Sequence, residues 1–274
     1  MEYGRNGLKQ STRIVVKVGT STITYPNGKL NLLRIEQLVR VLADLRNQDK
    51  EIILVTSGAI GVGASKLGLT YKPVTIQEKQ AMAAIGQGIL MQVYERIFSE
   101  YGIIAAQVLL TKDVIDRDDR KNNARNTFDT LLKYGVIPVV NENDTVATEE
   151  IEFGDNDTLS AVVAAIINAD LLIILSDIDG LYDKDPHKHA DAKLITRVDK
   201  IDDHLLENCG GAGSDFGTGG MKTKIMAARL CHDALIDMVI INGNKPRNIY
   251  KVLKGEEIGT LFPGKSKREG VVNE

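Results

Sequence analysis

The chain has little of what marks a nucleic-acid-binding, metal-binding or secreted protein. Its net charge is −3 over 274 residues, so it lacks the polybasic surface that DNA, RNA or anionic lipids require. Its two cysteines, Cys209 and Cys231, form neither a metal-binding spacing nor a disulfide framework. We therefore expect no nucleic-acid partner, no protein-bound metal and a reducing compartment.

Long hydrophobic segments are also missing. The longest apolar run, residues 161–167, is too short to cross a bilayer, and the polar N-terminus has no hydrophobic signal-peptide core. These absences predict a cytoplasmic protein without membrane contact. No tandem repeat or interdomain linker stands out, and the composition, 43% hydrophobic and 26% charged, is that of a globular chain of one large or two small domains.

What the sequence does contain is an alternation of two kinds of segment. Short runs rich in β-branched residues have the pattern of buried strands, and amphipathic segments between them have the pattern of helices. Asn31 fits the N-cap of the first helix, and Thr75 with Glu78 forms a capping box before the second. The alternation predicts an α/β fold, a three-layer αβα sandwich with a central, mainly parallel sheet. The expected strands are residues 13–19, 51–56, 102–110, 136–141, 171–176 and 236–242, and the expected helices are residues 31–46, 75–98, 122–134, 155–169 and 220–233.

The ends of the first two strands suit a phosphorylated ligand, because ligands of such sheets bind beyond the carboxyl ends of the strands. Lys17 stands beside Gly19, and a lysine within a buried run needs a partner for its ammonium group. A lysine at an exposed strand end explains the segment equally well. Ser57 lies in a small-residue turn that opens a helix, whose first N–H groups can hold an anion, although such turns are common.

Two polar clusters follow the fourth strand. Asp144 fits an ordinary turn, and alternatively it is a partner for a substrate ammonium group. Asn156 and Asp157 come at the start of a helix, where an acid stabilises the N-terminus. One acid is enough for that purpose, and Asp155 precedes them. The surplus acid indicates a second task, which is to hold lysines in place.

The end of the fifth strand and the loop before the last predicted helix both suit a nucleotide. Ser176 and Asp177 end the fifth strand, where an ordinary turn is the alternative. A glycine-rich loop then leads into a helix with Lys222 and Lys224 in its first turn. Backbone N–H groups and two lysines suit a triphosphate, whereas a merely solvated basic turn is disfavoured because cations oppose the helix dipole there. Walker A and protein-kinase motifs are absent, so any phosphate chemistry uses another scaffold.

Six separated segments carry a shared set of motifs: VKVGTS at residues 16–21, VTSGAI at 55–60, IGQ at 85–87, VNEND at 140–144, GDND at 154–157 and GTGGMKTK at 217–224. Together they resemble the amino-acid kinase family, and within it the members that phosphorylate the γ-carboxylate of L-glutamate. The segments occur in the family's order, and the resemblance runs from near residue 13 to Leu261 and Phe262, which is almost the whole chain. The VNEND and GDND pair is specific within the family.

The resemblance implies a role for each matching residue. Lys17 and Lys224 would stabilise the transferring phosphoryl group, and Asp157 would orient both. Ser57, Asp144 and Asn156 would bind glutamate. Mg²⁺ would arrive with ATP. The implied ATP site comprises Lys17, Ser176, Asp177, Thr218, Gly219, Gly220, Met221, Lys222, Thr223 and Lys224.

The resemblance also implies one amino-acid kinase domain over residues 1–274, with a core at about 13–262, assembled as a homodimer or homotetramer. Feedback inhibition by L-proline would follow the family pattern. Many glutamate-phosphorylating members carry a C-terminal PUA domain, whereas only a short tail follows Phe262 here, so regulation through that module is not expected. Position 176 is Ser where Thr is also common, which preserves the hydroxyl group.

Three other functions remain to be separated from this one. A sister kinase acting on acetylglutamate, aspartate, carbamate or UMP would share the phosphate site and differ at the acceptor residues Ser57, Asp144 and Asn156. A Rossmann oxidoreductase is disfavoured because no G-x-G-x-x-G follows the first strand. A catalytically silent ligand sensor is opposed by the complete set of lysines and aspartates.

Overall fold

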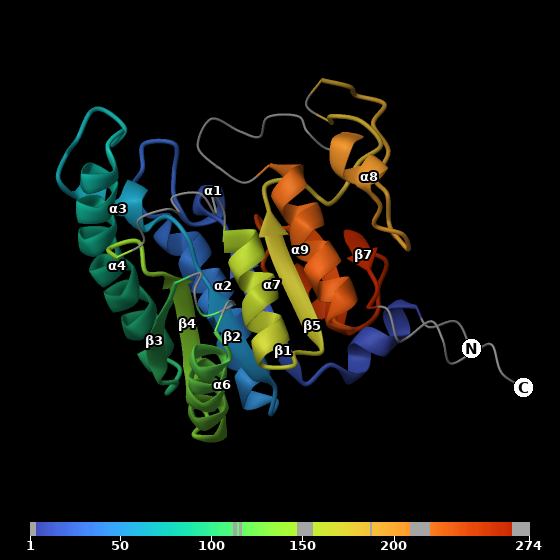
Figure 1. Cartoon of the computed structure of the whole chain (residues 1–274), viewed down its shortest axis with the longest axis horizontal. Coiled ribbons are helices and arrows are strands. Elements are labelled where there is room, and N and C mark those ends of the chain that lie inside the picture. Colours follow the sequence, from blue (N-terminus) through green and yellow to red (C-terminus); the bar gives the residue numbers. More distant parts are fainter. Residues whose placement is uncertain are drawn as a thin grey trace, which may run out of the picture.

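Among the residues that the structure describes, seven strands form one sheet with the order β3-β4-β2-β1-β5-β6-β7 (Figure 1). The structure is a computed structural model, and it describes residues 4–111, 114, 117–146, 156–186, 188–208 and 220–264. The strands are β1 (Arg13–Val18), β2 (Glu51–Val55), β3 (Ala105–Leu110), β4 (Ile137–Glu142), β5 (Leu171–Ser176), β6 (Asp237–Asn242) and β7 (Thr260–Phe262).

The first six strands pair in parallel, and β7 pairs with β6 in the antiparallel sense. The predicted, mainly parallel sheet is thus confirmed, and six of its strands lie within two or three residues of their predicted bounds. The strand β7 was not predicted, because three residues carry too little pattern to be recognised.

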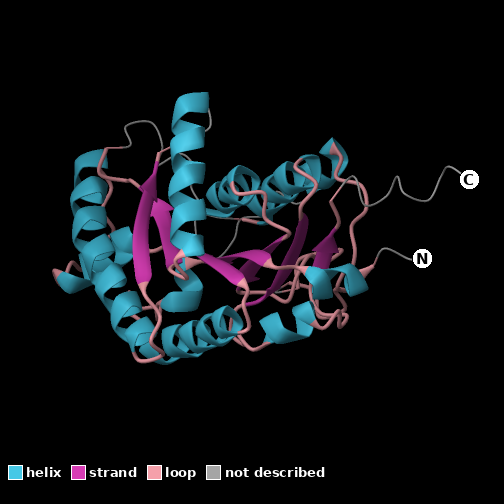
Figure 2. Cartoon of the chain, turned by 90° about the horizontal axis from the view of Figure 1, so that it is seen from below, coloured by secondary structure: helices cyan, strands magenta, loops and turns pink. Residues whose placement is uncertain are grey.

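Helices cover both faces of the sheet (Figure 2). The buried side chains of α6, α7 and α9 pack together on one face, and those of α2, α4 and α10 pack on the other, which confirms the three layers. The helical elements are η1 (Arg5–Gln10), α1 (Thr20–Ile23), α2 (Leu32–Asn47), α3 (Ala59–Lys66), α4 (Ile76–Ser99), α6 (Asp118–Lys133), α7 (Asn156–Ile166), α8 (Asp203–Asn208), α9 (Met221–Asp233) and α10 (Asn248–Leu253).

Local signals set the starts of two of these helices. The Asn31 side chain accepts the Arg34 N–H at 3.1 Å and caps α2. Thr75 and Glu78 form the predicted capping box of α4, with reciprocal bonds of 3.2 and 3.1 Å. In the part of the chain that is described, no helix is both long and apolar enough to traverse a lipid bilayer.

The alternation of side chains along β1 decides where Lys17 points. Ile14 and Val16 belong to the core beneath α2 and α4, whereas Val15 belongs to the core beneath α7 and α9. Successive strand residues point to opposite faces, so Lys17 shares the face of Val15. It therefore meets the first turns of α7 and α9.

The strand order makes β1 the switch point of the sheet. From β1 the chain builds β2, β3 and β4 on one side, and it then crosses to β5 on the other side of β1. In open α/β sheets, ligands bind at the carboxyl edge beside such a switch point. Lys17 lies next to the carboxyl end of β1.

Candidate active site

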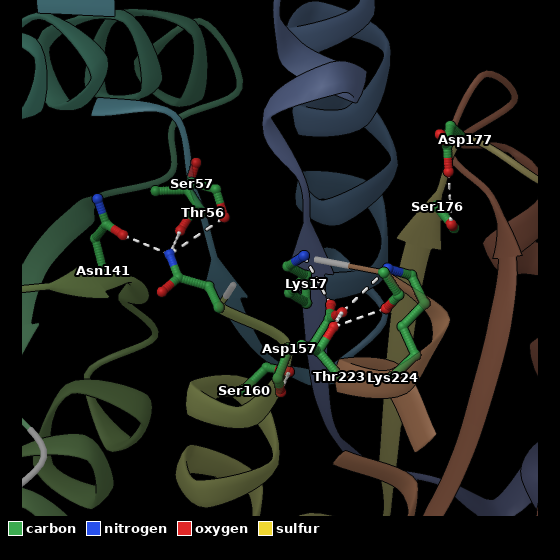
Figure 3. Close-up of polar contacts among 12 residues, drawn as sticks. Lys17, Thr56, Ser57, Asn141, Asp157, Ser160, Ser176, Asp177, Thr223 and Lys224 are labelled. Carbon is green, nitrogen blue, oxygen red and sulfur yellow. Dashed lines mark hydrogen bonds and ion pairs between the residues drawn. The ribbon is translucent and has the colours of Figure 1, made fainter. Parts of the chain in front are cut away.

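Three charged side chains from three elements meet at this switch point. The Lys17 ammonium group lies 2.7 Å from Asp157 Oδ1, and the Lys224 ammonium group lies 3.1 Å from Asp157 Oδ2 (Figure 3). Lys17 is 2% exposed, Asp157 is 0% exposed and Lys224 is 7% exposed. Together these three groups carry a formal charge of +1, two ammonium groups less one carboxylate. Buried positive charge of this kind favours an anionic ligand.

The first turn of α9 provides further polar groups. The Thr223 hydroxyl lies 3.0 Å from Asp157 Oδ2 and 2.8 Å from the Gly220 carbonyl oxygen. Gly220 is the N-cap of α9 and makes no side-chain cap hydrogen bond, and the N-terminus of a helix is a favourable place for a phosphate. Met221 is partly exposed, Lys222 is exposed, and the predicted ATP-site residues Thr218 and Gly219 lie outside the described residues.

A hydrogen-bonded network of side-chain amides, the amide network, lies on the side of Lys17 that faces away from Lys224 (Figure 3). The Asn156 amide nitrogen lies 2.6 Å from Asn141 Oδ1, 3.2 Å from the Ser57 hydroxyl and 2.5 Å from the Thr56 carbonyl oxygen. Asn141 in turn donates to Gln87 Oε1 at 2.7 Å. These five residues are nine-tenths or more buried. The predicted acceptor residues Ser57 and Asn156 therefore touch each other.

Three further predicted residues lie at or just beyond the carboxyl ends of β4 and β5. Asp144 follows β4 in a turn, and burial raises its pKa to about 6 from the ordinary 3.8. In the described part of the chain no hydrogen bond links it to Ser57 or Asn156. On the other flank, Ser176 ends β5 and its hydroxyl bonds the exposed Asp177 carboxylate at 3.1 Å.

The sheet orders these groups along one edge. Asn141 belongs to β4, Ser57 follows β2, Lys17 belongs to β1 and Ser176 belongs to β5, and the strand order is β4-β2-β1-β5. Figure 3 shows the same arrangement, with Asp157 and the two lysines between Ser57 on one side and Ser176 on the other. The edge thus has a polar site on each side of a cationic centre.

Sequence reasoning assigned no role to three residues of the amide network. Asn141 and Gln87 lie inside motifs that were recognised, and Thr56 contributes a backbone oxygen. A polar residue on the otherwise apolar face of a long helix, as Gln87 is on α4, is the signal that could have found it. For Asn141 the signal was hidden, because asparagine at a strand end also fits a turn.

The fold and the site define a class of protein, an α/β phosphate-binding protein with two buried ammonium groups at the switch point of its sheet. The chain matches the model of the Amino acid kinase family over residues 12–242. It belongs to that family, which confirms the resemblance in the motifs and makes the protein a phosphotransferase by family.

Similar proteins of known name support the same placement. The chain is 55% identical to the glutamate 5-kinase of Clostridium perfringens over 265 residues, which cover 95% of this chain and 98% of the relative. It is 58% identical to the glutamate 5-kinase of Caldanaerobacter subterraneus over 252 residues, covering 91% of this chain and 67% of that longer relative.

Solved structures share the fold at much lower identity. A UMP kinase from Bacillus anthracis matches with a TM-score of 0.63 and 15% identity, covering 92% of this chain and 96% of its own. An isopentenyl phosphate kinase from T. acidophilum matches with a TM-score of 0.62 and 20% identity, covering 91% and 99%. These likenesses establish the architecture alone.

Proposed function

We propose that the protein transfers the γ-phosphoryl group of ATP to the γ-carboxylate of L-glutamate, forming L-glutamyl 5-phosphate, the first step of proline biosynthesis. The observation that carries the proposal is the buried pair of ammonium groups, Lys17 and Lys224, on one carboxylate of Asp157. The pair lies between the amide network on one side and the carboxyl end of β5, which suits a nucleotide, on the other. This position matches a transfer between two substrates. Relatives named glutamate 5-kinase, at 51–58% identity, support glutamate as the acceptor.

The acceptor needs no general base. A glutamate side-chain carboxylate has a pKa of about 4.3 and is ionised at neutral pH, so it is already a nucleophile. No histidine or cysteine belongs to the site described above. The chemistry therefore depends on bringing two anions together and on stabilising the charge that moves to the leaving phosphate.

Lys17 and Lys224 are placed to offset that repulsion. Two unit charges about 4 Å apart interact by about 4 kcal/mol at an effective dielectric of 20, so an anionic acceptor approaches a triphosphate only where cations flank the reacting oxygens. Asp157 holds both ammonium groups in place before ATP binds. In the transition state the same groups stabilise the transferring phosphoryl group.

The two flanks of the centre bind the two substrates. On the amide side, Ser57 and Asn156 hold glutamate, and the Asp144 carboxylate pairs with its ammonium group. On the other side, Ser176, Asp177 and the first turn of α9 bind ATP, with Lys17 reaching its terminal phosphate. When bound to the ATP phosphates, Mg²⁺ would supply additional positive charge there.

The proposal has four further parts. Residues 13–262 act as one amino-acid kinase domain, in line with the family match and the single sheet. The enzyme works in the cytoplasm, where ATP is available. It assembles as a homodimer or homotetramer, which the exposed Leu32 and Leu33 on α2 support. L-proline inhibits it by feedback.

ATP-dependent formation of γ-glutamyl hydroxamate tests the function directly. Purified protein is incubated with L-glutamate, MgATP and hydroxylamine, with and without L-proline. The expected result is hydroxamate that depends on both substrates and declines with proline. Absence of hydroxamate, together with ADP release in the presence of aspartate, acetylglutamate, carbamate or UMP, would contradict glutamate as the acceptor. The identities of the relatives do not favour these alternatives.

Variants of the two lysines test the cationic centre. Lys17→Ala and Lys224→Ala should each lower kcat by about 100-fold or more, because each removes a preorganised charge at the transferring group. Lys251→Ala, at an exposed site on α10, controls for loss of a positive charge. Circular dichroism should show a retained fold, and near-normal turnover by either site variant contradicts the assignment.

A further inference from the structure

The amide network described above ends in a buried donor on α4. Asn156 Nδ2 contacts the Thr56 carbonyl oxygen and Asn141 Oδ1, and Asn141 Nδ2 donates to Gln87 Oε1 at 2.7 Å. Gln87 is 8% exposed. Its own amide nitrogen, Nε2, stands at the end of this chain of bonds.

The donor-to-acceptor direction of this series of hydrogen bonds is set by a backbone atom. A carbonyl oxygen can only accept, so the Thr56 carbonyl identifies the nitrogen of Asn156. Asn141 must then present its oxygen to Asn156 and its nitrogen to Gln87. Rotating either amide by half a turn would bring two donors or two acceptors face to face. The Gln87 oxygen is thereby occupied, and its nitrogen must donate elsewhere.

No acceptor for Gln87 Nε2 exists among the described residues. Buried polar groups in folded proteins are almost always bonded, and an unsatisfied buried donor destabilises the protein. A buried donor that has no acceptor among the described residues, and that ends a network containing the predicted acceptor-binding residues Ser57 and Asn156, is suited to an acceptor that the ligand brings.

We propose that Gln87 Nε2 donates to the α-carboxylate of the acceptor amino acid, which makes Gln87 a specificity-determining residue. This inference rests on the proposed function. The reacting γ-carboxylate must lie at Lys17 on β1, whereas Gln87 is reached through Asn141 on β4, two strands away in the order β4-β2-β1. The carboxylate at Gln87 is therefore the one that does not react, and compounds without it are poor acceptors.

Two substitutions at this position separate substrate binding from structural support. Gln87→Met keeps the length of the side chain and removes its donor and acceptor. Gln87→Glu keeps the acceptor for Asn141, removes the donor and, at about pH 8.5, adds a charge that repels a carboxylate. Gln92→Glu, at an exposed position of the same helix, controls for the added charge.

For Gln87→Met we expect the KM for L-glutamate to rise about 10- to 100-fold, the range for loss of a buried hydrogen bond to a charged group. The kcat and the KM for ATP should stay within about threefold, because the contact is remote from the reacting atoms. Gln87→Glu should raise the KM for glutamate at least as much. Gln92→Glu should leave all three values unchanged.

L-isoglutamine, in which a carboxamide replaces the α-carboxylate, provides the sharpest test. When it is used as a substrate or competitive inhibitor, its affinity relative to that of glutamate should rise by about tenfold or more in Gln87→Glu. The reason is that the new carboxylate accepts a hydrogen bond from its amide. An unchanged preference overturns the inference, and so does a normal glutamate KM in Gln87→Glu beside a raised one in Gln87→Met. Failure of the unmodified enzyme to phosphorylate glutamate overturns the proposed function and this inference with it.

Discussion

At the scale of single residues, Asp157 carries the largest electrostatic demand, since one buried carboxylate faces two buried ammonium groups. Asp157→Asn retains the shape and removes the charge, so the two cations are left to repel each other. We expect kcat to fall by about 100-fold or more and the Tm of the ligand-free protein to fall as well. Added phosphate should restore part of the Tm, because an anion then separates the lysines.

Asp191→Asn is the matched control for this change. Asp191 is exposed and pairs with Lys184 at 2.5 Å, and exposed ion pairs contribute little to stability. Differential scanning fluorimetry, with and without phosphate, distinguishes the two sites. A Tm for Asp157→Asn that matches wild type and does not respond to phosphate would show that the carboxylate is not needed to hold the lysines.

Asp144 predicts a pH dependence of glutamate binding. Burial raises its pKa to about 6, so the folded protein destabilises the ionised form, and this cost grows as the pH rises from 3.8 through about 6. A substrate ammonium group offsets the cost only where Asp144 is ionised. The glutamate KM should therefore be constant above about pH 7 and rise by up to tenfold per pH unit below pH 6.

Steady-state kinetics at saturating ATP measure this dependence. The groups of glutamate itself change little in charge between about pH 5.5 and 8, so the profile reports the protein. Asp144→Asn should raise the KM and flatten the profile. A wild-type KM that is constant from pH 5.5 to 8 would show that Asp144 does not bind the ammonium group.

Residue chemistry alone was sufficient to find some members of the site. Lys17 attracts attention because an ammonium group interrupts a buried strand, and Asp157 because a helix start needs only one acid. Gln87 and Asn141 could not be found in this way, because their importance comes from the bonds between them. Those bonds depend on how α4 packs on the sheet, which no local pattern encodes.

At the scale of elements, the contact between α3 and α4 requires glycine. A Cβ atom at Gly86 would lie 1.8 Å from the carbonyl oxygen of Ala59, whereas a Cβ atom at Gly88 would meet nothing within 4 Å. Gly86→Ala must push the helices apart, and we expect it to lower the free energy of unfolding by about 2 kcal/mol or more. Gly88→Ala should raise it by about 1 kcal/mol, because alanine favours the helix.

Urea unfolding of the two variants compares them within one helix. Because Gln87 adjoins Gly86, the glutamate KM should also rise in Gly86→Ala and stay unchanged in Gly88→Ala. Equal stabilities for the two variants would mean that α3 and α4 do not approach as closely as this contact requires.

The elements that were predictable are those whose burial leaves a long pattern in the sequence. Six strands were located by continuous β-branched runs, because strands covered on both faces are apolar throughout. The helix expected from residue 122 begins at Asp118 instead, since its first turn is polar and exposed and so carries no apolar signal. The short elements α1, α8, α10 and β7 leave no such pattern, because contacts with the rest of the fold stabilise them.

At the scale of the whole molecule, topology joins segments that are far apart in sequence. Lys17, Asp157 and Lys224 converge because α7, which follows β4, and α9, which precedes β6, both start at the carboxyl edge of the sheet beside β1. Periodicity predicts the elements and the parallel sheet, but not the strand order. The strand ends and the surplus acid therefore pointed to a shared phosphate site, and the family motifs identified which lysines Asp157 holds.

Arg5 connects the N-terminal η1 to the opposite end of the described chain. Its guanidinium group donates to the backbone carbonyls of Ile258 and Gly259 at 2.5 and 2.8 Å, of Thr196 at 2.8 Å and of Glu256 at 3.3 Å. Four carbonyl oxygens around one planar cation form a contact that lysine cannot reproduce. It fixes the loop that leads into β7.

Arg5→Lys should therefore destabilise the fold without altering catalysis. The charge remains, but a single ammonium group cannot reach four carbonyls, and we expect a loss of about 2 kcal/mol in the free energy of unfolding. Because Arg5 binds the edge of the sheet beyond β6, kcat and both KM values should match wild type. Lys9→Ala, at an exposed site of the same η1, should change neither property. A stability for Arg5→Lys equal to that of Lys9→Ala would show that this contact does not hold the edge of the sheet.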